Sequence, residues 1–271
     1  MLSRWLSAFL GLSFCVVASA APERIIALSP HAVELIFSLE SGDKLVGVVE
    51  HSDYPRQALK IPRIGSAHGL SYETILALKP DLIVAWEGGT SELALQKLSK
   101  LGIKIVYSHA SHYQELPQQI RELGEALGKV ELADRLATQY LKDMAALQQR
   151  YQDKPAKKVF YQLWDSPLMT VANGAWIQSL LPICQLENPF VGLSKAYPQV
   201  NLEQVLAYEP EVIIIAQDDE PQRRAVWQQW PYIPAVKNDA LVFVNPDRLH
   251  RPTLRSLAGI EELCQRVHAL D

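Results

Sequence analysis

Apolar runs alternate with amphipathic segments along most of the chain. Short runs rich in Ile, Val and Leu predict β-strands at residues 24–29, 44–49, 81–86, 104–107, 158–163, 211–216 and 241–244. Between them, apolar residues recur every three or four positions, which predicts helices at residues 30–39, 92–100, 113–127, 176–184, 221–230 and 252–270. Strands that alternate with helices indicate parallel sheets with crossover helices, so the predicted fold class is α/β.

The segment at residues 130–151 differs from the rest of this pattern. It contains neither glycine nor proline, and its apolar residues fall on one helical face. A helix of this length would extend roughly 33 Å. Strand–helix alternation resumes after it. The sequence therefore predicts an N-terminal α/β lobe at residues 21–129, one long linking helix at 130–151 and a C-terminal α/β lobe at 152–271.

Two stretches of the chain resemble each other at an offset of 130 residues. Residues 71–89 read SYETILALKPDLIVAWEGG, and residues 201–219 read NLEQVLAYEPEVIIIAQDD. Five positions are identical, among them Glu73 with Glu203 and one proline in each copy. Each copy predicts a short helix, a turn at the proline and a buried strand. We therefore expect an internal duplication with one copy in each lobe; a chance match within a short apolar window is the alternative.

The N-terminus has the features of a secretory signal peptide. Arg4 precedes an apolar run at residues 6–18, which is too short to cross a bilayer. An Ala-Ser-Ala sequence at residues 18–20 matches a signal-peptidase site. We expect residues 1–20 to be removed and the mature chain to be exported; an uncleaved anchor is the alternative.

Export determines how the cysteines are interpreted. Cys15 lies in the predicted signal peptide, and a lipoprotein would use such a cysteine, but Phe14 occupies the place where lipoprotein signals need a small residue. Cys184 and Cys264 remain in the mature chain, an even number in an oxidising compartment. We expect a disulfide between them, with two separate buried thiols as the alternative.

Composition and charge narrow the class of protein and partner. The 271 residues are 48% hydrophobic and 21% charged, which is typical of a folded globular protein and excludes a disordered chain or a collagen-like repeat. The net charge of −4 gives no overall basic surface, so we expect no nucleic-acid partner. No stretch after the signal peptide predicts insertion into a membrane.

The usual local motifs of catalysis are absent from the sequence. There is no P-loop, no H-E-x-x-H, no G-x-S-x-G and no C-x-x-C. We therefore expect a protein that is not an enzyme and holds no metal. A metal site assembled from three of the seven histidines, or an exported hydrolase with catalytic groups far apart in sequence, are the alternatives.

Aromatic and polar residues gather instead where the predicted strands end. These residues are His51, Tyr54, Trp86, Trp164, Asp247 and Arg251, together with Tyr197 in a proline-flanked loop. In open α/β sheets, ligands bind beyond the carboxyl ends of the strands. A cleft between two lobes, lined with aromatic rings and a few polar groups, suits a large planar or amphipathic ligand.

Several longer motifs resemble those of a known family. They are RIIALSP at 24–30, HSDYP at 51–55, LALKPDLIVAWEGG at 76–89, LGIKIV at 101–106, YPQVNLEQVLAYEP at 197–210, and Asp247 with Arg251 ahead of Cys264. With them, essentially the whole mature chain resembles the periplasmic vitamin B12 (cobalamin) binding proteins of ABC importers. The L-x-P-D-L-I element is shared with siderophore- and haem-binding proteins, whereas S-D-Y-P, A-W-x-G-G and the cysteine pair are more specific.

The resemblance implies a helical-backbone periplasmic binding protein with cobalamin bound between its lobes. It further implies a monomer in the periplasm that needs no cofactor, carries cobalamin as a transported ligand and delivers it to the membrane permease of an ABC importer. Haem, another tetrapyrrole or a siderophore is the alternative ligand.

Individual site residues follow from the same resemblance. Trp86 and Tyr197 match aromatic wall positions of the family's pocket, and Asp247 and Arg251 match polar contacts. Trp164 is assigned to the pocket from its place after a predicted strand.

Three positions depart from the family's aromatic pattern. His51, Met169 and Ala67 stand where family members can have tyrosine, phenylalanine and tryptophan, so the aromatic wall is thinner here. The imidazole of His51 could bind the ligand's cobalt, but it would have to displace a group already on the metal. We expect His51 to be a stacking or hydrogen-bonding wall residue instead.

The two equivalent glutamates of the repeat have two interpretations. A glutamate in the first turn of a helix favours the helix dipole by about 0.3–1 kcal/mol, which is a purely local role. In the family that the chain resembles, docking carboxylates lie at the positions of Glu73 and Glu203. We therefore expect both to contact the permease, which is typically a two-fold dimer.

Overall fold

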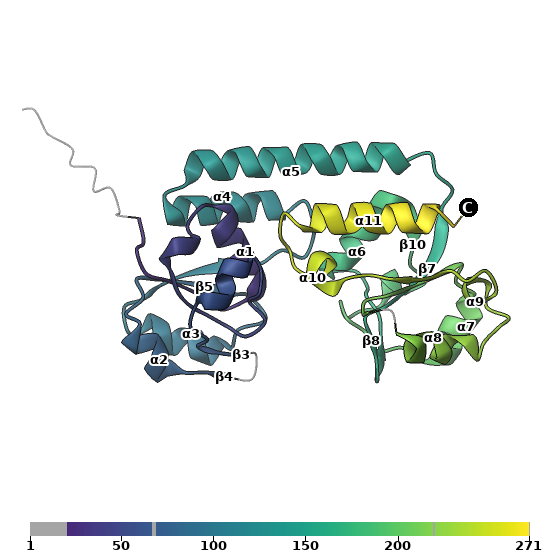
Figure 1. Ribbon diagram of the computed structural model, residues 1–271, viewed down its shortest axis with the longest axis horizontal. Coiled ribbons are helices and arrows are strands. Elements are labelled where there is room, and N and C mark those ends of the chain that lie inside the picture. Colours follow the sequence, from purple (N-terminus) through teal and green to yellow (C-terminus); the bar gives the residue numbers. More distant parts are fainter. Residues whose placement is uncertain (1–20, 67–68, 219, 271) are drawn as a thin grey trace, which may run out of the picture.

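The computed structural model describes residues 21–66, 69–218 and 220–270. The predicted signal peptide and Ala67 lie outside these residues. The described chain forms two α/β lobes side by side, with the long helix α5 (Val130–Tyr151) running along both of them (Figure 1). The predicted fold class, two parallel-sheet lobes joined by one long helix, is therefore confirmed.

The N-terminal lobe is built on four parallel strands in the order β2-β1-β5-β6. The strands are β1 (Ile25–Ala27), β2 (Leu45–Val48), β5 (Leu82–Trp86) and β6 (Lys104–Ser108). The helices are α1 (Pro30–Ser38), α2 (Tyr72–Ala77), α3 (Glu92–Ser99) and α4 (Leu116–Leu127). A short antiparallel pair, β3 (Gly65–Ser66) with β4 (Gly69–Leu70), completes the lobe.

The C-terminal lobe repeats this arrangement with the strand order β10-β7-β11-β12. The strands are β7 (Lys157–Gln162), β10 (Leu186–Glu187), β11 (Val212–Ile215) and β12 (Leu241–Phe243). The helices are α6 (Trp176–Leu180), α7 (Leu202–Tyr208), α8 (Pro221–Gln228), α9 (Pro234–Lys237), α10 (Pro246–Leu249) and α11 (Ser256–His268). A hairpin pairs β8 (Trp164–Asp165) with β9 (Leu168–Met169).

The repeated sequence has the same local structure in both lobes. α2 and α7 each follow a residue whose side chain caps the helix, Ser71 in one lobe and Asn201 in the other. Each helix leads to a left-handed residue, Lys79 with φ 46° or Glu209 with φ 53°, and then through a proline to a buried strand. Positions 130 residues apart therefore occupy equivalent places in the two lobes.

The central strands β1, β5 and β11 are buried on both faces, as in parallel sheets covered by helices. In β1, Ile25 belongs to the large core that extends through α5 into the other lobe. Its neighbour Ile26 belongs to a second core on the opposite face of the N-terminal sheet. Among the described residues, no helix is both long and apolar enough to cross a membrane.

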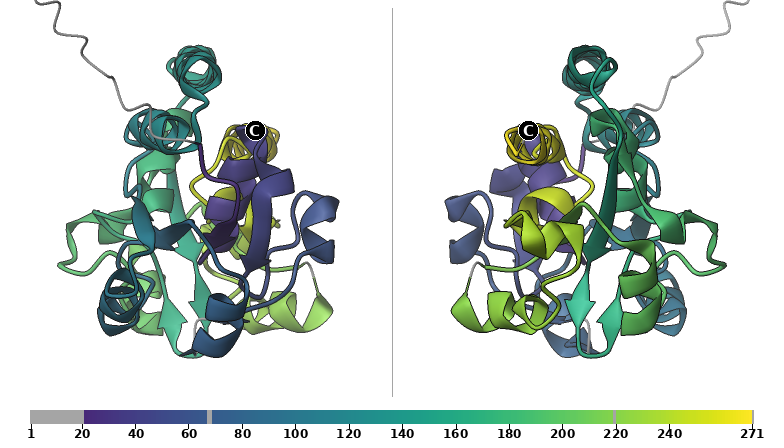
Figure 2. Two further views of the ribbon diagram at one scale, coloured as in Figure 1. Left: turned by 90° about the vertical axis from the view of Figure 1, so that its left-hand side faces the viewer. Right: turned by 90° about the vertical axis from the view of Figure 1, so that its right-hand side faces the viewer.

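The linking helix α5 packs against one helix of each lobe. Gly124 of α4 permits a close approach, because a Cβ atom there would lie 2.2 Å from the Ala133 Cβ atom. On the other side, the Tyr140 hydroxyl lies 3.1 Å from Ser256 Oγ of α11. In the end-on views, α5 stands above α4 and the yellow α11 (Figure 2). One continuous helix is thus anchored in both lobes.

Several predicted helices are shorter in the structure. The helix predicted at 176–184 ends as α6 at Leu180 and continues as a 3₁₀ segment, because Pro182 has no backbone N–H for an α-helical bond. The helix predicted at 252–270 begins at Ser256. The β8–β9 hairpin and α10 were not predicted, since such short elements carry too little periodic pattern.

A disulfide joins Cys184 and Cys264, as the sequence predicts. It connects the 3₁₀ segment to α11 and closes a loop with a sequence separation of 80 residues. Replacing both cysteines by alanine is expected to lower the free energy of unfolding by about 4 kcal/mol, since the unfolded chain regains the loop's conformational entropy. Denaturant titration of the oxidised wild type and the variant measures this loss, and equal transition midpoints would contradict it.

Candidate functional site at the carboxyl ends of the strands

A hollow of about 420 Å³ lies at the carboxyl ends of β1, β2 and β5. Two of the predicted ligand residues, His51 and Trp86, line it. Leu28, Ser29, Val49 and Thr90, which follow the same strands, also line it, and Tyr72 at the start of α2 adds a further ring. The parallel topology brings these residues together, because the strands that precede them end at one edge of the sheet.

Trp86 is the largest ring at this hollow, and its side chain is 44% exposed. The two glycines that follow it serve the turn in different ways. Gly88 adopts φ 78°, which favours glycine. A Cβ atom at Gly89 would lie 1.9 Å from the indole, so only glycine leaves room for the ring. The A-W-x-G-G motif therefore fixes the place of the tryptophan.

His31 supports Trp86 from the protein side. The residue is 5% exposed, and its ring meets the indole edge-to-face with the centroids 5.6 Å apart. One ring nitrogen, Nε2, lies 3.2 Å from Ser29 Oγ. Burial, helped by the positive charge of Arg251, lowers the pKa of His31 to about 4. The imidazole is therefore neutral under Trp86 at neutral pH.

This lowered pKa predicts a pH dependence of stability. Between pH 6.5 and pH 4 the unfolded chain protonates His31 while the folded protein keeps it neutral, so stability is lost as the pH falls. Over the full range from pH 6.5 to pH 4, this lowers the free energy of unfolding by about 3 kcal/mol. In a His31→Gln variant, which cannot titrate, the free energy of unfolding should fall less over the same range. Denaturant titrations at pH 7, 5.5 and 4.5 test this, and parallel pH profiles would contradict it.

Three predicted ligand residues of the C-terminal lobe, Trp164, Met169 and Tyr197, lie on two adjacent segments. Trp164 and Met169 face each other across the β8–β9 hairpin. Met169 also forms a bridge with Gln199, two residues beyond Tyr197. Trp164 is 54% exposed and Tyr197 is 45% exposed. Two aromatic rings and a methionine thus lie near the carboxyl end of β7.

Asp247 and Arg251 lie beyond the end of β12, Asp247 within the short helix α10 and Arg251 just after it. They form an ion pair with 2.7 Å between Asp247 Oδ1 and Arg251 Nη2. The same guanidinium reaches across to the N-terminal lobe, where Nη1 lies 2.9 Å from both Glu34 Oε1 and Asp53 Oδ1. With a side chain only 11% exposed, Arg251 is largely engaged by protein groups.

The sequence interpretation identified Asp247 beside Arg251 but missed Glu34, Asp53 and Arg255. Glu34 of α1 is buried, and its Oε2 lies 3.2 Å from Arg255 Nε. Burial raises the pKa of Glu34, against the opposing effect of the two arginines. The Arg255 guanidinium stacks 3.8 Å above the Tyr54 ring. In the sequence, this cluster could have been suspected from Glu34, a glutamate on the apolar face of the helix predicted at residues 30–39.

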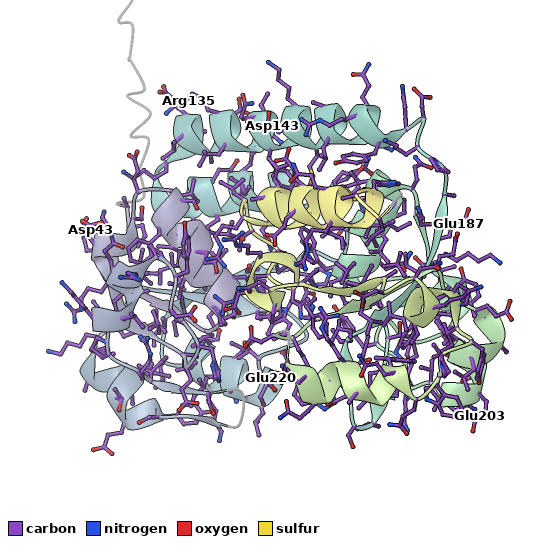
Figure 3. All side chains as sticks on the ribbon, turned by 45° about the vertical axis from the view of Figure 1, so that its right-hand side comes forward. Asp43, Arg135, Asp143, Glu187, Glu203 and Glu220 are labelled. Atoms are coloured by element: carbon purple, nitrogen blue, oxygen red, sulfur yellow. A yellow bond between two sulfur atoms is a disulfide. The ribbon has the colours of Figure 1, made fainter. Side chains whose placement is uncertain are left out.

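Glu73 and Glu203 occupy equivalent exposed positions in the first turns of α2 and α7. The two helices lie at opposite ends of the molecule, both on the side away from α5 (Figure 1). Figure 3 shows the Glu203 side chain directed outward from its lobe. Neither glutamate lines the hollow at His51 and Trp86.

The histidines are dispersed through the structure. Apart from His51 at the hollow, His112 stacks on Tyr113, and His250 Nε2 lies 3.0 Å from the Tyr161 hydroxyl. Within residues 21–66, 69–218 and 220–270, no three His, Cys, Asp or Glu side chains gather in a group that could hold a metal ion. His68 lies outside these residues.

Known proteins are similar to this chain in both sequence and fold. The vitamin B12-binding protein of Vibrio vulnificus (strain YJ016) is 37% identical over 262 residues, which cover 96% of each chain. The crystal structure of the periplasmic vitamin B12-binding protein of Vibrio cholerae superimposes with a TM-score of 0.83 and 35% identity, covering 92% of this chain and 98% of that one.

A more distant neighbour shares the fold alone. The periplasmic haem-binding protein of Roseiflexus sp. RS-1 superimposes with a TM-score of 0.81 but only 21% identity, covering 92% of this chain and 98% of that one. The model of the periplasmic binding protein family matches residues 25–247, which include both sheets and the linking helix. The chain therefore belongs to the periplasmic binding protein family.

Proposed function

We propose that this protein captures vitamin B12 (cobalamin) in the periplasm and delivers it to the membrane permease of an ABC importer. Relatives that bind vitamin B12 match nearly the whole chain at up to 37% identity, whereas the haem-binding neighbour is similar at the level of the fold. Membership of a binding-protein family indicates a solute-binding protein rather than an enzyme. Cobalamin would be its cargo and not a cofactor.

The proposal is supported mainly by the exposed aromatic rings at the carboxyl ends of strands in both lobes. Tyr54 and Trp86 come from the N-terminal lobe, and Trp164 and Tyr197 from the C-terminal lobe, each between 44% and 54% exposed. The Arg251 ion pairs with Glu34 and Asp53 hold these two edges against each other. A ligand with a broad apolar face and polar rim groups, such as a corrin ring, matches that arrangement.

Each predicted ligand-binding residue has a role in this proposal. Trp86 and Tyr197 would pack against the corrin, with Trp164 and Met169 beside them. His51 and Asp247 would hydrogen-bond its peripheral amide groups. Arg251 would contact the ligand only with the small part of its guanidinium that the carboxylates leave uncovered.

Copurification tests the proposed function directly. The mature protein, isolated from the periplasm of cells grown with cobalamin, should be pink and show the corrin absorption bands. A protein purified from haem-containing medium should lack a Soret band. A colourless protein from cobalamin-supplemented cells, or a haem spectrum, would refute cobalamin as the cargo.

The linking helix predicts little movement of the lobes on binding. α5 is continuous and contacts α4 of one lobe and α11 of the other, so it resists bending more than two extended strands would. We expect a rotation of a few degrees between the ligand-free and the ligand-bound protein. Crystal structures of both states measure it, and a rotation above roughly 20° would contradict a rigid connection.

A further inference from the structure

We propose that Glu34 is a positioning residue for the ligand site, which acts through Arg251 on the backbone of His51. The inference rests on the proposed function, because His51 belongs to the hollow proposed to hold part of the ligand. Glu34 does not line that hollow. The effect of Glu34 would pass to Arg251 in the C-terminal lobe and from there to His51 in the N-terminal lobe.

Glu34 is a buried charged residue on an otherwise apolar stretch of α1. Its side chain is 2% exposed, on a helix whose neighbouring positions Val33 and Leu35 are apolar and buried. A buried carboxylate is costly unless it is paired. Glu34 has two arginine partners, both from the C-terminal lobe, at 2.9 Å and 3.2 Å. Its location therefore serves to hold those arginines.

Arg251 connects this buried charge to the edge of the hollow. Its guanidinium donates to Glu34 and Asp53 through Nη1, and to the carbonyl oxygen of His51 through Nη2 at 3.1 Å. A guanidinium is planar and its donors have fixed directions. When Glu34 fixes this plane, it also fixes where the group donates to the carbonyl of His51.

His51 needs such support because of its backbone conformation. Its φ is +63°, in the left-handed region that residues with a side chain rarely adopt. The hydrogen bond from Arg251 holds the carbonyl in this conformation, and His51 lines the hollow. If the support were lost, the backbone could relax and the imidazole would leave its place.

A double-mutant cycle on cobalamin affinity tests this coupling. Glu34→Gln keeps the size of the side chain and removes its charge; we expect three- to ten-fold weaker binding. His51→Ala should weaken binding at least as much, and adding Glu34→Gln to it should change the affinity less than two-fold. Losses that multiply in the double variant would overturn the proposal. Glu261→Gln, which breaks an ion pair between α11 and α5 far from His51, is the matched control and should bind like wild type.

A second measurement needs no ligand and therefore separates this proposal from the proposed function. Nuclear magnetic resonance of protein with labelled histidines gives the His51 signal, assigned by its loss in His51→Ala. The signal should shift in Glu34→Gln and stay in place in Glu261→Gln. If Glu34→Gln does not fold, Arg251→Lys, which lacks the planar fork, should produce the shift. An unmoved His51 signal would overturn the positioning role even if the protein binds cobalamin, whereas a shifted signal in a protein that binds none would refute only the proposed function.

Discussion

Replacing Trp86 by alanine is expected to weaken cobalamin binding ten- to a hundred-fold. Trp86 is 44% exposed, so a large part of its surface is available to a ligand. A large aromatic side chain buries about 150–250 Å² in total. At about 25 cal/mol per Å² of apolar area, even partial contact corresponds to a loss of about 1–3 kcal/mol. Titration calorimetry measures the change in affinity.

Tyr232→Ala is the matched control for this prediction. Tyr232 is also an exposed aromatic residue, at 60%, but it precedes α9 and hence the amino end of β12. Its loss should leave the affinity within two-fold of wild type. Unchanged affinity in a folded Trp86→Ala protein would remove Trp86 from the site.

Reversing both repeat glutamates, Glu73→Arg with Glu203→Arg, is expected to abolish cobalamin uptake by cells. We propose that these carboxylates dock on matching basic residues of a two-fold permease. Equivalent positions in two related lobes, both exposed and both on the side away from α5, support that role. Like charges brought together at an interface oppose association by several kcal/mol. Uptake of radiolabelled cobalamin in cells that express the variant measures the effect.

Two controls distinguish docking from folding or ligand binding. The purified double variant should bind cobalamin within about two-fold of wild type, because neither glutamate lines the hollow. Glu131→Arg with Asp153→Arg makes the same charge change at exposed positions at the two ends of α5 and should leave uptake normal. Normal uptake by the Glu73/Glu203 variant would refute docking, and loss of ligand binding would assign these residues to the fold or the site.

The elements that the sequence predicted well are those with strong local patterns. The buried strand at residues 81–86, the linking helix at 130–151 and the paired helix–proline–strand units each combine periodicity with clear start or stop residues. The residues at strand ends, such as His51 and Trp86, could be placed together because parallel topology determines which ends of strands share an edge.

The contacts between the lobes could not be predicted in this way. Glu34 and Arg251 are 217 positions apart, and no local pattern indicates that one carboxylate meets that guanidinium. Asp247 and Arg251 form a local pair four residues apart, but no local pattern indicates that the same guanidinium also reaches Asp53 in the other lobe. Such networks depend on tertiary packing, which sequence periodicity does not encode.

Calorimetric titration of the purified mature protein with cobalamin and with haem determines which of the two ligands is the cargo. We expect saturable binding of one cobalamin per chain that prior addition of haem does not reduce. Saturable binding of haem, with no heat and no absorbance change on addition of cobalamin, would contradict it.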